Sequence, residues 1–161
     1  MADPIAPVEV AFLGRANTDG DAVVWTPKQR VLITGDIVVH PVPYASASYP
    51  ADWIAVLGKI DAFDYAWLVP GHGEVQTDHA YVRKLAAALA EVRSQVGPLA
   101  AKGVPLAEVY KQTDFKDLKD SFAGADDFDR FLTSAFFLGA IVSNAYKEAR
   151  GEPIVQGHVG G

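Results

Sequence analysis

The sequence predicts an α/β (α+β) fold: a small mixed β-sheet covered by helices, followed by a helical C-terminal extension. Short apolar segments separated by turn residues fill residues 1–77, and one segment with helical spacing lies among them. From residue 78 helical spacing replaces the strand patterns. We therefore expect a β-rich part over residues 1–77, a helical extension over residues 78–150 packed on it as one compact unit, and a flexible Gly-rich tail over residues 151–161.

The strand segments come first. After a stiff entry at Pro4–Pro7, alternating apolar residues predict a strand at Val8–Leu13, which should pair with the hairpin that follows. That hairpin consists of an apolar strand ending near Trp25, a turn at Pro27-Lys28 and a second strand that delivers Asp36 at its C-terminal end. The next segment, residues 37–44, contains two prolines and is expected to be a loop rather than a central strand.

A helix and a further strand continue the pattern. Residues 52–60 place Trp53, Val56, Leu57 and Ile60 on one helical face, with Asp52 or Ser48 as the cap, and this helix should cover one face of the sheet. The strand at residues 65–69 then ends in Pro70-Gly71-His72-Gly73. Because both strands present a polar side chain where they end, Asp36 and His72 should lie at one edge of the sheet.

Three motifs in this region resemble the C-terminal half of the metallo-β-lactamase-like superfamily. That superfamily has Gly-x-x-His-Thr-x-Gly-Asp, then Thr-Gly-Asp, then Pro-Gly-His-Gly. This chain has, in the same order, Gly14-Arg15-Ala16-Asn17-Thr18-Asp19-Gly20-Asp21, Thr34-Gly35-Asp36 and Pro70-Gly71-His72-Gly73. The resemblance implies half of a four-layer αββα sandwich with Asp36 and His72 as metal ligands.

Two departures from the superfamily limit the implied metal site. The His-x-His-x-Asp-His motif, which holds zinc mainly from the N-terminal half, does not occur in this sequence. Asn17 stands where the superfamily has its next histidine ligand, and a carboxamide is a poorer zinc ligand than imidazole. Two ligands seldom hold a catalytic zinc, so any zinc is expected to be weakly bound or absent. The alternative is that both are turn residues, with Asp36 accepting backbone hydrogen bonds.

Four further residues are expected to line the pocket around this pair. Asn17 and Thr18 belong to the motif loop, and Asp21 would be a carboxylate that fixes the loop. His40 is close to Asp36 in sequence, although a lone histidine beside proline is more often a loop residue than a ligand.

The C-terminal part is expected to be helical. A helix over residues 78–96, capped by Thr77 or Asp78, should stop at Gly97-Pro98 and keep His79 in a solvent or packing role. A short helix is expected over residues 105–113, a connector or turn of helix over 114–119, a break at 121–125 and a long helix over 126–150.

The last helix is apolar over more than one stripe, from Phe128 to Tyr146. Burial of so broad a surface requires either an intramolecular core or a second chain. The resemblance adds a separate reason for self-association, because a lone half of the sandwich exposes an apolar sheet face. Two copies could cover that face by packing sheet to sheet, or the helices after Asp78 could fold back over it. We expect a homodimer.

Composition excludes several classes of function. A net charge of −6 and the lack of a Lys or Arg run argue against nucleic-acid and anionic-membrane partners. The absence of cysteine leaves only His, Asp and Glu as strong metal ligands and excludes a cysteine nucleophile. Neither a basic N-terminal segment nor a long apolar run is present, so we expect a soluble chain without a signal peptide, in a compartment that the sequence leaves open.

Two functions from different classes fit the sequence. The first is a truncated superfamily relative with an incomplete metal site, non-catalytic alone, which acts as a self-associating binding or assembly module and could bind a small-molecule ligand. The alternative is a zinc-dependent hydrolase of an ester, lactam, thioester or phosphoester. Its site would be completed by a second chain, by His40 or by an omitted N-terminal segment. A third possibility is that the chain is one half of a split enzyme, with a separate polypeptide supplying the His-x-His-x-Asp-His motif.

Overall fold

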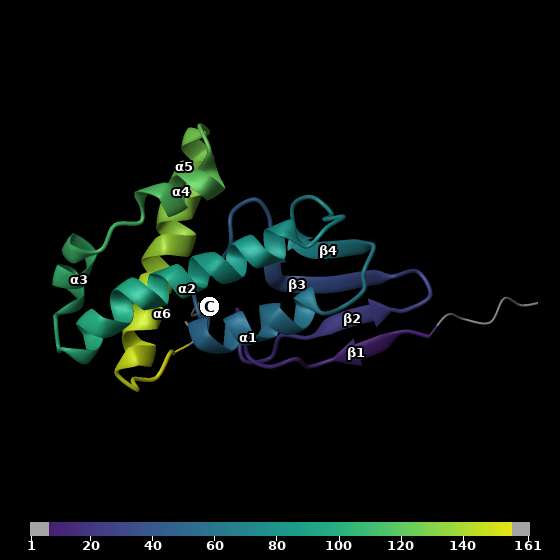
Figure 1. Cartoon of the computed structure of the whole chain (residues 1–161), viewed down its shortest axis with the longest axis horizontal. Coiled ribbons are helices and arrows are strands. Elements are labelled where there is room, and N and C mark those ends of the chain that lie inside the picture. Colours follow the sequence, from purple (N-terminus) through teal and green to yellow (C-terminus); the bar gives the residue numbers. More distant parts are fainter. Residues whose placement is uncertain (1–6, 156–161) are drawn as a thin grey trace, which may run out of the picture.

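The computed structural model describes residues 7–155 and contains a four-stranded mixed sheet with helices packed on it (Figure 1). Its strands are β1 (Glu9–Ala11), β2 (Val23–Thr26), β3 (Val31–Val39) and β4 (Trp67–His72), in that order across the sheet. The first three strands are antiparallel neighbours, and β3 pairs with β4 in parallel. The predicted mixed sheet is confirmed, whereas the expectations for Pro4 to Ala6 and for residues 156–161 lie outside the described residues.

Two strands run further than the sequence suggests. β3 continues through Ile37, Val38 and Val39, which are buried, and ends only before His40 and Pro41. The expectation of a loop from residue 37 was therefore wrong for its first three residues, because their apolar side chains belong to the core. β4 likewise extends through Pro70 and Gly71 to His72, since Pro70 lies on an edge strand, where a missing N–H is tolerated.

Helix α1 (Pro50–Asp61) provides the crossover that parallel pairing of β3 and β4 requires. Its predicted face is confirmed: Trp53, Val56, Leu57 and Ile60 are buried in one core with Leu32 and Leu68 of the sheet. The indole N–H of Trp53 also donates to the carbonyl of Ile37, 3.0 Å away. The helix therefore covers one face of the sheet, as the sequence predicts.

The predicted caps of α1 were wrong. Tyr49 is the N-cap residue and makes no side-chain cap bond. Ser48 instead donates to the carbonyl of Ala45, and Asp52 pairs with Arg15. The free N–H of Ala51 is satisfied from far away in the sequence, because the carboxylate of Glu148 accepts it at 2.8 Å.

Helix α2 (Ala80–Ala101) passes through Pro98, where the sequence predicts a stop. Val96 and Ala100, on either side of Pro98, are both buried. Packing of these side chains offsets the roughly 3 kcal/mol that an internal proline costs a helix. At the N-terminus His79 is the N-cap residue, one position after the predicted cap, although Asp78 still accepts the N–H of Ala80 at 2.8 Å.

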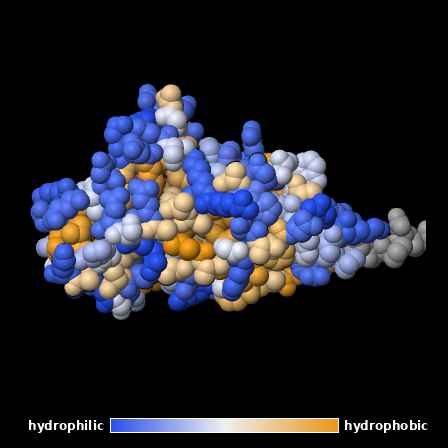
Figure 2. All heavy atoms as spheres, in the orientation of Figure 1, coloured by the Kyte–Doolittle hydropathy of each residue, from blue (hydrophilic) through white to orange (hydrophobic). Residues whose placement is uncertain are grey.

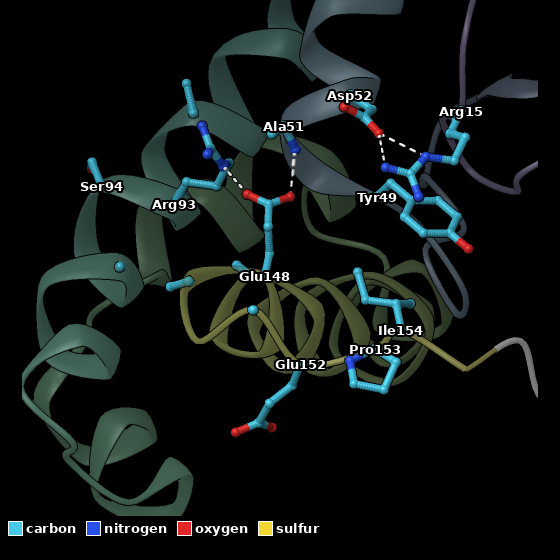
Figure 3. A pocket seen from close by; sticks show the side chains of 15 residues that line it. Arg15, Tyr49, Ala51, Asp52, Arg93, Ser94, Glu148, Glu152, Pro153 and Ile154 are labelled. Atoms are coloured by element: carbon cyan, nitrogen blue, oxygen red, sulfur yellow. Dashed lines mark hydrogen bonds and ion pairs between the residues drawn. The ribbon is translucent and has the colours of Figure 1, made fainter.

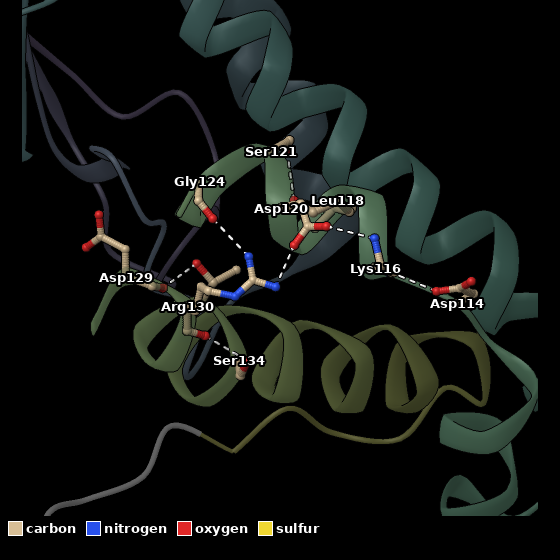
Figure 4. Close-up of polar contacts among 10 residues, drawn as sticks. Asp114, Lys116, Leu118, Asp120, Ser121, Gly124, Asp129, Arg130 and Ser134 are labelled. Carbon is tan, nitrogen blue, oxygen red and sulfur yellow. Dashed lines mark hydrogen bonds and ion pairs between the residues drawn. The ribbon is translucent and has the colours of Figure 1, made fainter. Parts of the chain in front are cut away.

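The remaining helices follow α2 in the chain, and α3 and α6 pack against it. They are α3 (Leu106–Gln112), α4 (Lys116–Ala123) and a long helix made of α5 (Asp127–Leu132), the π-helical segment η1 (Thr133–Leu138) and α6 (Gly139–Ala149). α4 replaces most of the predicted connector and break, and the chain turns only at Gly124, whose φ is +56°. Asp120 joins α4 to α5 because it pairs with both Lys116 and Arg130 (Figure 4). These two cations hold the pKa of Asp120 below its usual value.

The long helix has mixed burial. Phe137, Ile141, Val142 and Ala145 are in the core, whereas Phe128, Phe131 and Phe136 are exposed. Within the extension α2 packs on α6, and it also packs on α1, the helix that covers the sheet. Figure 2 shows hydrophilic side chains over α3 and over the corner of α4 and α5. Among the helices of residues 7–155, none is both long and apolar enough to cross a membrane.

Candidate functional site

The site centres on Asp36 of β3 and His72 of β4. The register pairs Gly35 with Pro70 and Val39 with His72, so β3 carries extra residues between these two pairs. Such an irregularity bends a strand and redirects its side chains. It brings Asp36 and His72 together, with 3.6 Å between Oδ1 of Asp36 and Nε2 of His72. Asp36 lies within β3 and His72 is the last residue of β4, so neither lies on a turn beyond its strand.

Two glycines allow the backbones to approach at this point. A Cβ atom on Gly71 would lie 2.0 Å from Oδ1 of Asp36 and 2.8 Å from the carbonyl carbon of Gly35. A Cβ atom on Gly73, whose φ is +85°, would lie 1.9 Å from the carbonyl oxygen of His40. The Pro-Gly-His-Gly motif therefore has a steric role, because a side chain at either glycine would push β4 away from β3.

The pair is accessible to solvent and to ligands. The side chains of His72 and Asp36 are 72% and 47% exposed. In the part of the chain that the structure describes, no backbone N–H donates to Asp36, so the alternative role as a turn acceptor is not found there. A separation of 3.6 Å is long for a hydrogen bond. It is near the roughly 3.4 Å between two ligands of a tetrahedral zinc with bonds of about 2.0–2.1 Å.

The motif loop before β2 is fixed by its own hydrogen bonds. Asp21 accepts the N–H of Thr18 at 2.7 Å and its hydroxyl at 2.6 Å. Asn17 is buried, with 3% of its surface exposed, and its Oδ1 has no hydrogen-bond partner. None of these three residues lines the cavity beside the Asp36–His72 pair.

His40 also stays outside the lining of that cavity. Its ring packs edge-on against Tyr81, with 4.8 Å between ring centroids, and its Nδ1 is buried without a partner. Its backbone N–H donates to the carbonyl of His72 at 3.1 Å. Within residues 7–155 no three His, Asp or Glu side chains gather in a metal-binding arrangement. The chain alone offers two donors, which does not fit the usual three protein ligands of a catalytic zinc.

A cavity of about 270 Å³ opens directly beside the pair. Most of its wall is apolar and comes from two regions, the segment after β3 and the long C-terminal helix. The lining residues are Asp36, Val39, Val42, Pro43, Tyr44, His72, Leu132 and Phe136. Sequence reasoning missed Leu132 and Phe136. The sequence signal for Leu132 and Phe136 was the large number of apolar residues on the last helix, which is more than the core buries.

The wall formed by Phe136 depends on the π-helical segment. In η1 the N–H of Gly139 bonds to the carbonyl of Ser134, five residues earlier. The carbonyl of Phe136 accepts the N–H of Ala45 at 3.0 Å, which ties the segment after β3 to the helix. The rings of Tyr44 and Phe136 stack nearby, with centroids 6.1 Å apart. Single π-helical turns are frequent at functional sites, and this one shapes the cavity.

A second cavity, of about 740 Å³, lies between α1, α2 and α6 (Figure 3). Four of its charged groups form two ion pairs with one another. Arg15 pairs with Asp52, and Arg93 pairs with Glu148, whose other oxygen accepts the N–H of Ala51. This cavity therefore has a structural explanation in the contact between the helical extension and α1.

A cluster at the start of α2 is also structural. His79 stacks on Tyr65 with ring centroids 4.1 Å apart, and its Nδ1 lies 3.0 Å from Asp61, which also pairs with Arg83. Desolvation raises the pKa of Asp61, but bonding and charge from Arg83 and His79 outweigh it and leave that pKa lowered. Burial and the charge of Asp61 raise the pKa of Tyr65 to about 12. These contacts join the end of α1 to α2.

Comparison with known proteins gives structural neighbours only. No family model and no curated protein matches the sequence. Similar solved structures include VMB-1, with 25% identity over 53% of this chain and a TM-score of 0.47. They also include the metallo-β-lactamase DIM-1, with 26% identity over 52% and a TM-score of 0.45, and a metallo-β-lactamase from Pontibacter korlensis, with 21% identity over 52% and a TM-score of 0.47.

Each of these matches covers less than half of the solved chain. The matched part is 41%, 40% and 41% of the three solved chains, so this chain spans about two fifths of their length. Metallo-β-lactamases are among the solved structures that are similar to about half of this chain.

Proposed function

We propose that this chain is a self-associating binding module on a metallo-β-lactamase-like half fold, with an incomplete metal site and no catalysis by the chain alone. The observation that carries the proposal is the second face of the sheet. Val10, Ile33 and Trp67 are 72%, 40% and 51% exposed, although they lie on strands of the central sheet. Exposed apolar surface of this kind marks an interaction site.

Two of these exposed residues, Val10 and Ile33, lie in one row across the four strands, and Trp67 pairs with Val31 in the next row. Val10 pairs with Val24, Val24 with Ile33, and Ile33 with Val69, so these four side chains share one face. Leu32 and Leu68, one position away, point to the opposite face and are fully buried. In the extension α2 packs on α1 and α6, and among residues 7–155 the positions Val10, Ile33 and Trp67 of the open face remain exposed.

A second copy of this chain is the occupant that the face fits best. The row contains only Val and Ile, so two identical faces could meet without like-charge repulsion, despite the net charge of −6. Sheets packed face to face lie about 10 Å apart, with strands aligned within about 30°. Such a dimer would form a double sheet with one Asp36–His72 pair from each copy.

Sedimentation velocity on the full chain tests this proposal. We expect a dimer at micromolar concentration for the wild type and for Phe128→Lys, which changes an exposed residue outside the sheet face. Ile33→Lys should give a folded monomer, because each copy would place a charge opposite its partner's apolar row. A wild type that stays monomeric at about 100 μM would overturn self-association. The face would then be tested against a separate polypeptide that carries the His-x-His-x-Asp-His motif.

The second candidate is a zinc-dependent hydrolase of an ester, lactam, thioester or phosphoester, completed by a second chain or by an N-terminal half. The 3.6 Å spacing and the exposure of Asp36 and His72 favour it, since both donors are free to bind one ion. In such an assembly the buried Asn17 would not contact substrate, and Asp21 would support the loop. Thr18 would stay bonded to Asp21.

Metal content separates the two candidates. Zinc, manganese and iron would be measured per chain on protein purified without chelator, for the wild type and for Asp36→Ala with His72→Ala. About one metal per chain, lost in the double variant, favours the hydrolase and calls for assays of the four substrate classes. A folded wild type that retains no metal favours the binding module.

A further inference from the structure

We propose that the cavity beside Asp36 and His72 binds a primary amine that carries an aromatic or branched apolar group. This inference rests on the proposed function, because it requires that the two donors are not saturated by a metal. It assigns a ligand class from three observations on the described residues: the acceptors on the floor of the cavity, the apolar wall, and the source of that wall.

The floor of the cavity offers two hydrogen-bond acceptors. Oδ1 of Asp36 and Nε2 of His72 are 3.6 Å apart, and an imidazole nitrogen without a proton is an acceptor. An ammonium group has three donors and bonds at about 2.7–3.2 Å, so one nitrogen reaches both acceptors. No cationic side chain lines this cavity, and Asp36 forms no ion pair with Lys or Arg among residues 7–155. Its charge is available to a ligand.

The wall of the cavity accommodates an apolar group. Tyr44 and Phe136 stack with ring planes 29° apart, and each is about two-fifths exposed. Their rings can contact an aromatic group and attract an adjacent cation, which is favourable within about 6 Å of a ring centroid. Leu132 and Val42 add aliphatic surface. A volume of about 270 Å³ limits the ligand to a small molecule.

Part of the cavity wall comes from outside the segment that resembles the superfamily. Leu132 and Phe136 belong to the long C-terminal helix, whereas the three motifs end at Gly73. The bond from the N–H of Ala45 to the carbonyl of Phe136 fixes the aromatic side of the cavity against the segment after β3. The cavity is therefore a feature of this chain, and its ligand need not be a substrate of the superfamily.

Charge selects an amine over an acid. A carboxylate would meet the negative charge of Asp36 at short range, and like charges at that distance disfavour binding. A chelating acid would become the better ligand only if a metal ion lay between the two. Comparison of an amine and an acid with the same aromatic group therefore distinguishes the proposed site from a metal site.

The experiment is a calorimetric titration of the full chain after treatment with EDTA. The probes are phenethylamine, 3-phenylpropionate, which replaces the amine by a carboxylate, and n-butylamine, which lacks the ring. We expect phenethylamine to bind at least 10-fold more tightly than either of the others. Asp36→Asn and Phe136→Ala should each weaken it at least 10-fold, and the matched control Phe128→Ala should leave it unchanged.

Equal binding of phenethylamine and 3-phenylpropionate would overturn the inference. So would an unchanged affinity for phenethylamine in a folded Asp36→Asn variant, or binding of 3-phenylpropionate alone after one equivalent of zinc is added. His72→Gln serves as a second variant if Asp36→Asn does not fold. Molecular mass is measured on the same samples. A wild-type dimer that does not bind phenethylamine would overturn this inference and leave self-association standing. A wild-type monomer that binds phenethylamine would overturn self-association and leave this inference standing.

Discussion

Glu148 allows the sharpest test of whether the helical extension and the sheet part form one unit. Its Oε2 accepts the N–H of Ala51 at the start of α1, and its Oε1 accepts from Arg93 of α2, each at 2.8 Å (Figure 3). Glu148→Ala removes both bonds. Loss of a helix cap costs about 1 kcal/mol, and loss of a negative charge near a helix N-terminus costs about 0.3–1 kcal/mol.

The ion pair with Arg93 adds little, because the side chain of Arg93 is 42% exposed and such pairs contribute about 0–1 kcal/mol. We therefore expect Glu148→Ala to lower the free energy of unfolding by about 2 kcal/mol, a fall in Tm of roughly 4–8 °C for a chain of this size. Glu148→Gln should lose about half as much, because its amide oxygen still accepts the N–H of Ala51.

Urea unfolding followed by tryptophan fluorescence and by far-UV circular dichroism measures these changes. The control is Glu152→Ala, which removes an exposed pair with Arg150 and no helix cap, and should cost less than about 0.5 kcal/mol. The reasoning fails if Glu148→Ala and Glu152→Ala agree within about 0.5 kcal/mol. It also fails if the two probes report separate transitions, since sheet part and extension would then unfold independently.

Three further predictions concern the strands and the start of α2. Gly71→Ala should destabilise the chain by at least about 2 kcal/mol in urea, since its Cβ would clash with backbone, whereas Gly58→Ala, in open space on α1, should stabilise it by about 0.5–1 kcal/mol. Asp36→Ala should change thermal stability by less than about 0.5 kcal/mol, because no backbone bond is lost. Because the pKa of Tyr65 in the folded chain, about 12, exceeds the ordinary tyrosine value of 10.0, stability should fall as pH rises from 10 to 12, and less steeply in Tyr65→Phe.

The sequence predicts the elements whose apolar residues repeat regularly. The buried face of α1 and the hairpin of β2 and β3 are both found as expected. Each depends on neighbours within a few residues in the chain, so local spacing contains the information needed.

Errors arise where distant residues decide the local structure. β3 runs past Asp36 because Ile37 and Val38 are buried in the core, and α2 runs through Pro98 because the core holds the residues on both sides. The cap of α1 was missed because it comes from Glu148, 97 positions away from Ala51. Proline rules and cap preferences describe local costs, and burial here exceeds them.

The site residues also divide into those that the sequence motifs identify and those that they do not. The motifs identify Asp36 and His72, which the structure brings together, because adjacent parallel strands place their ends at one edge. They do not identify Leu132 and Phe136, which come from the long C-terminal helix, where Phe136 lies in a π-helical turn that no spacing rule encodes. Asn17, Thr18, Asp21 and His40 remain predicted site residues outside the cavity lining.

The bond between Ala51 and Glu148 also has a consequence for folding during synthesis. The two residues are 97 positions apart, and ribosomes add about 5–20 residues per second. The first turn of α1 therefore emerges roughly 5–20 s before its cap is made. During that interval the nascent sheet and α1 lack both the cap and the cover of α6, so this stage of translation is when the chain is most exposed to aggregation or to capture by a chaperone.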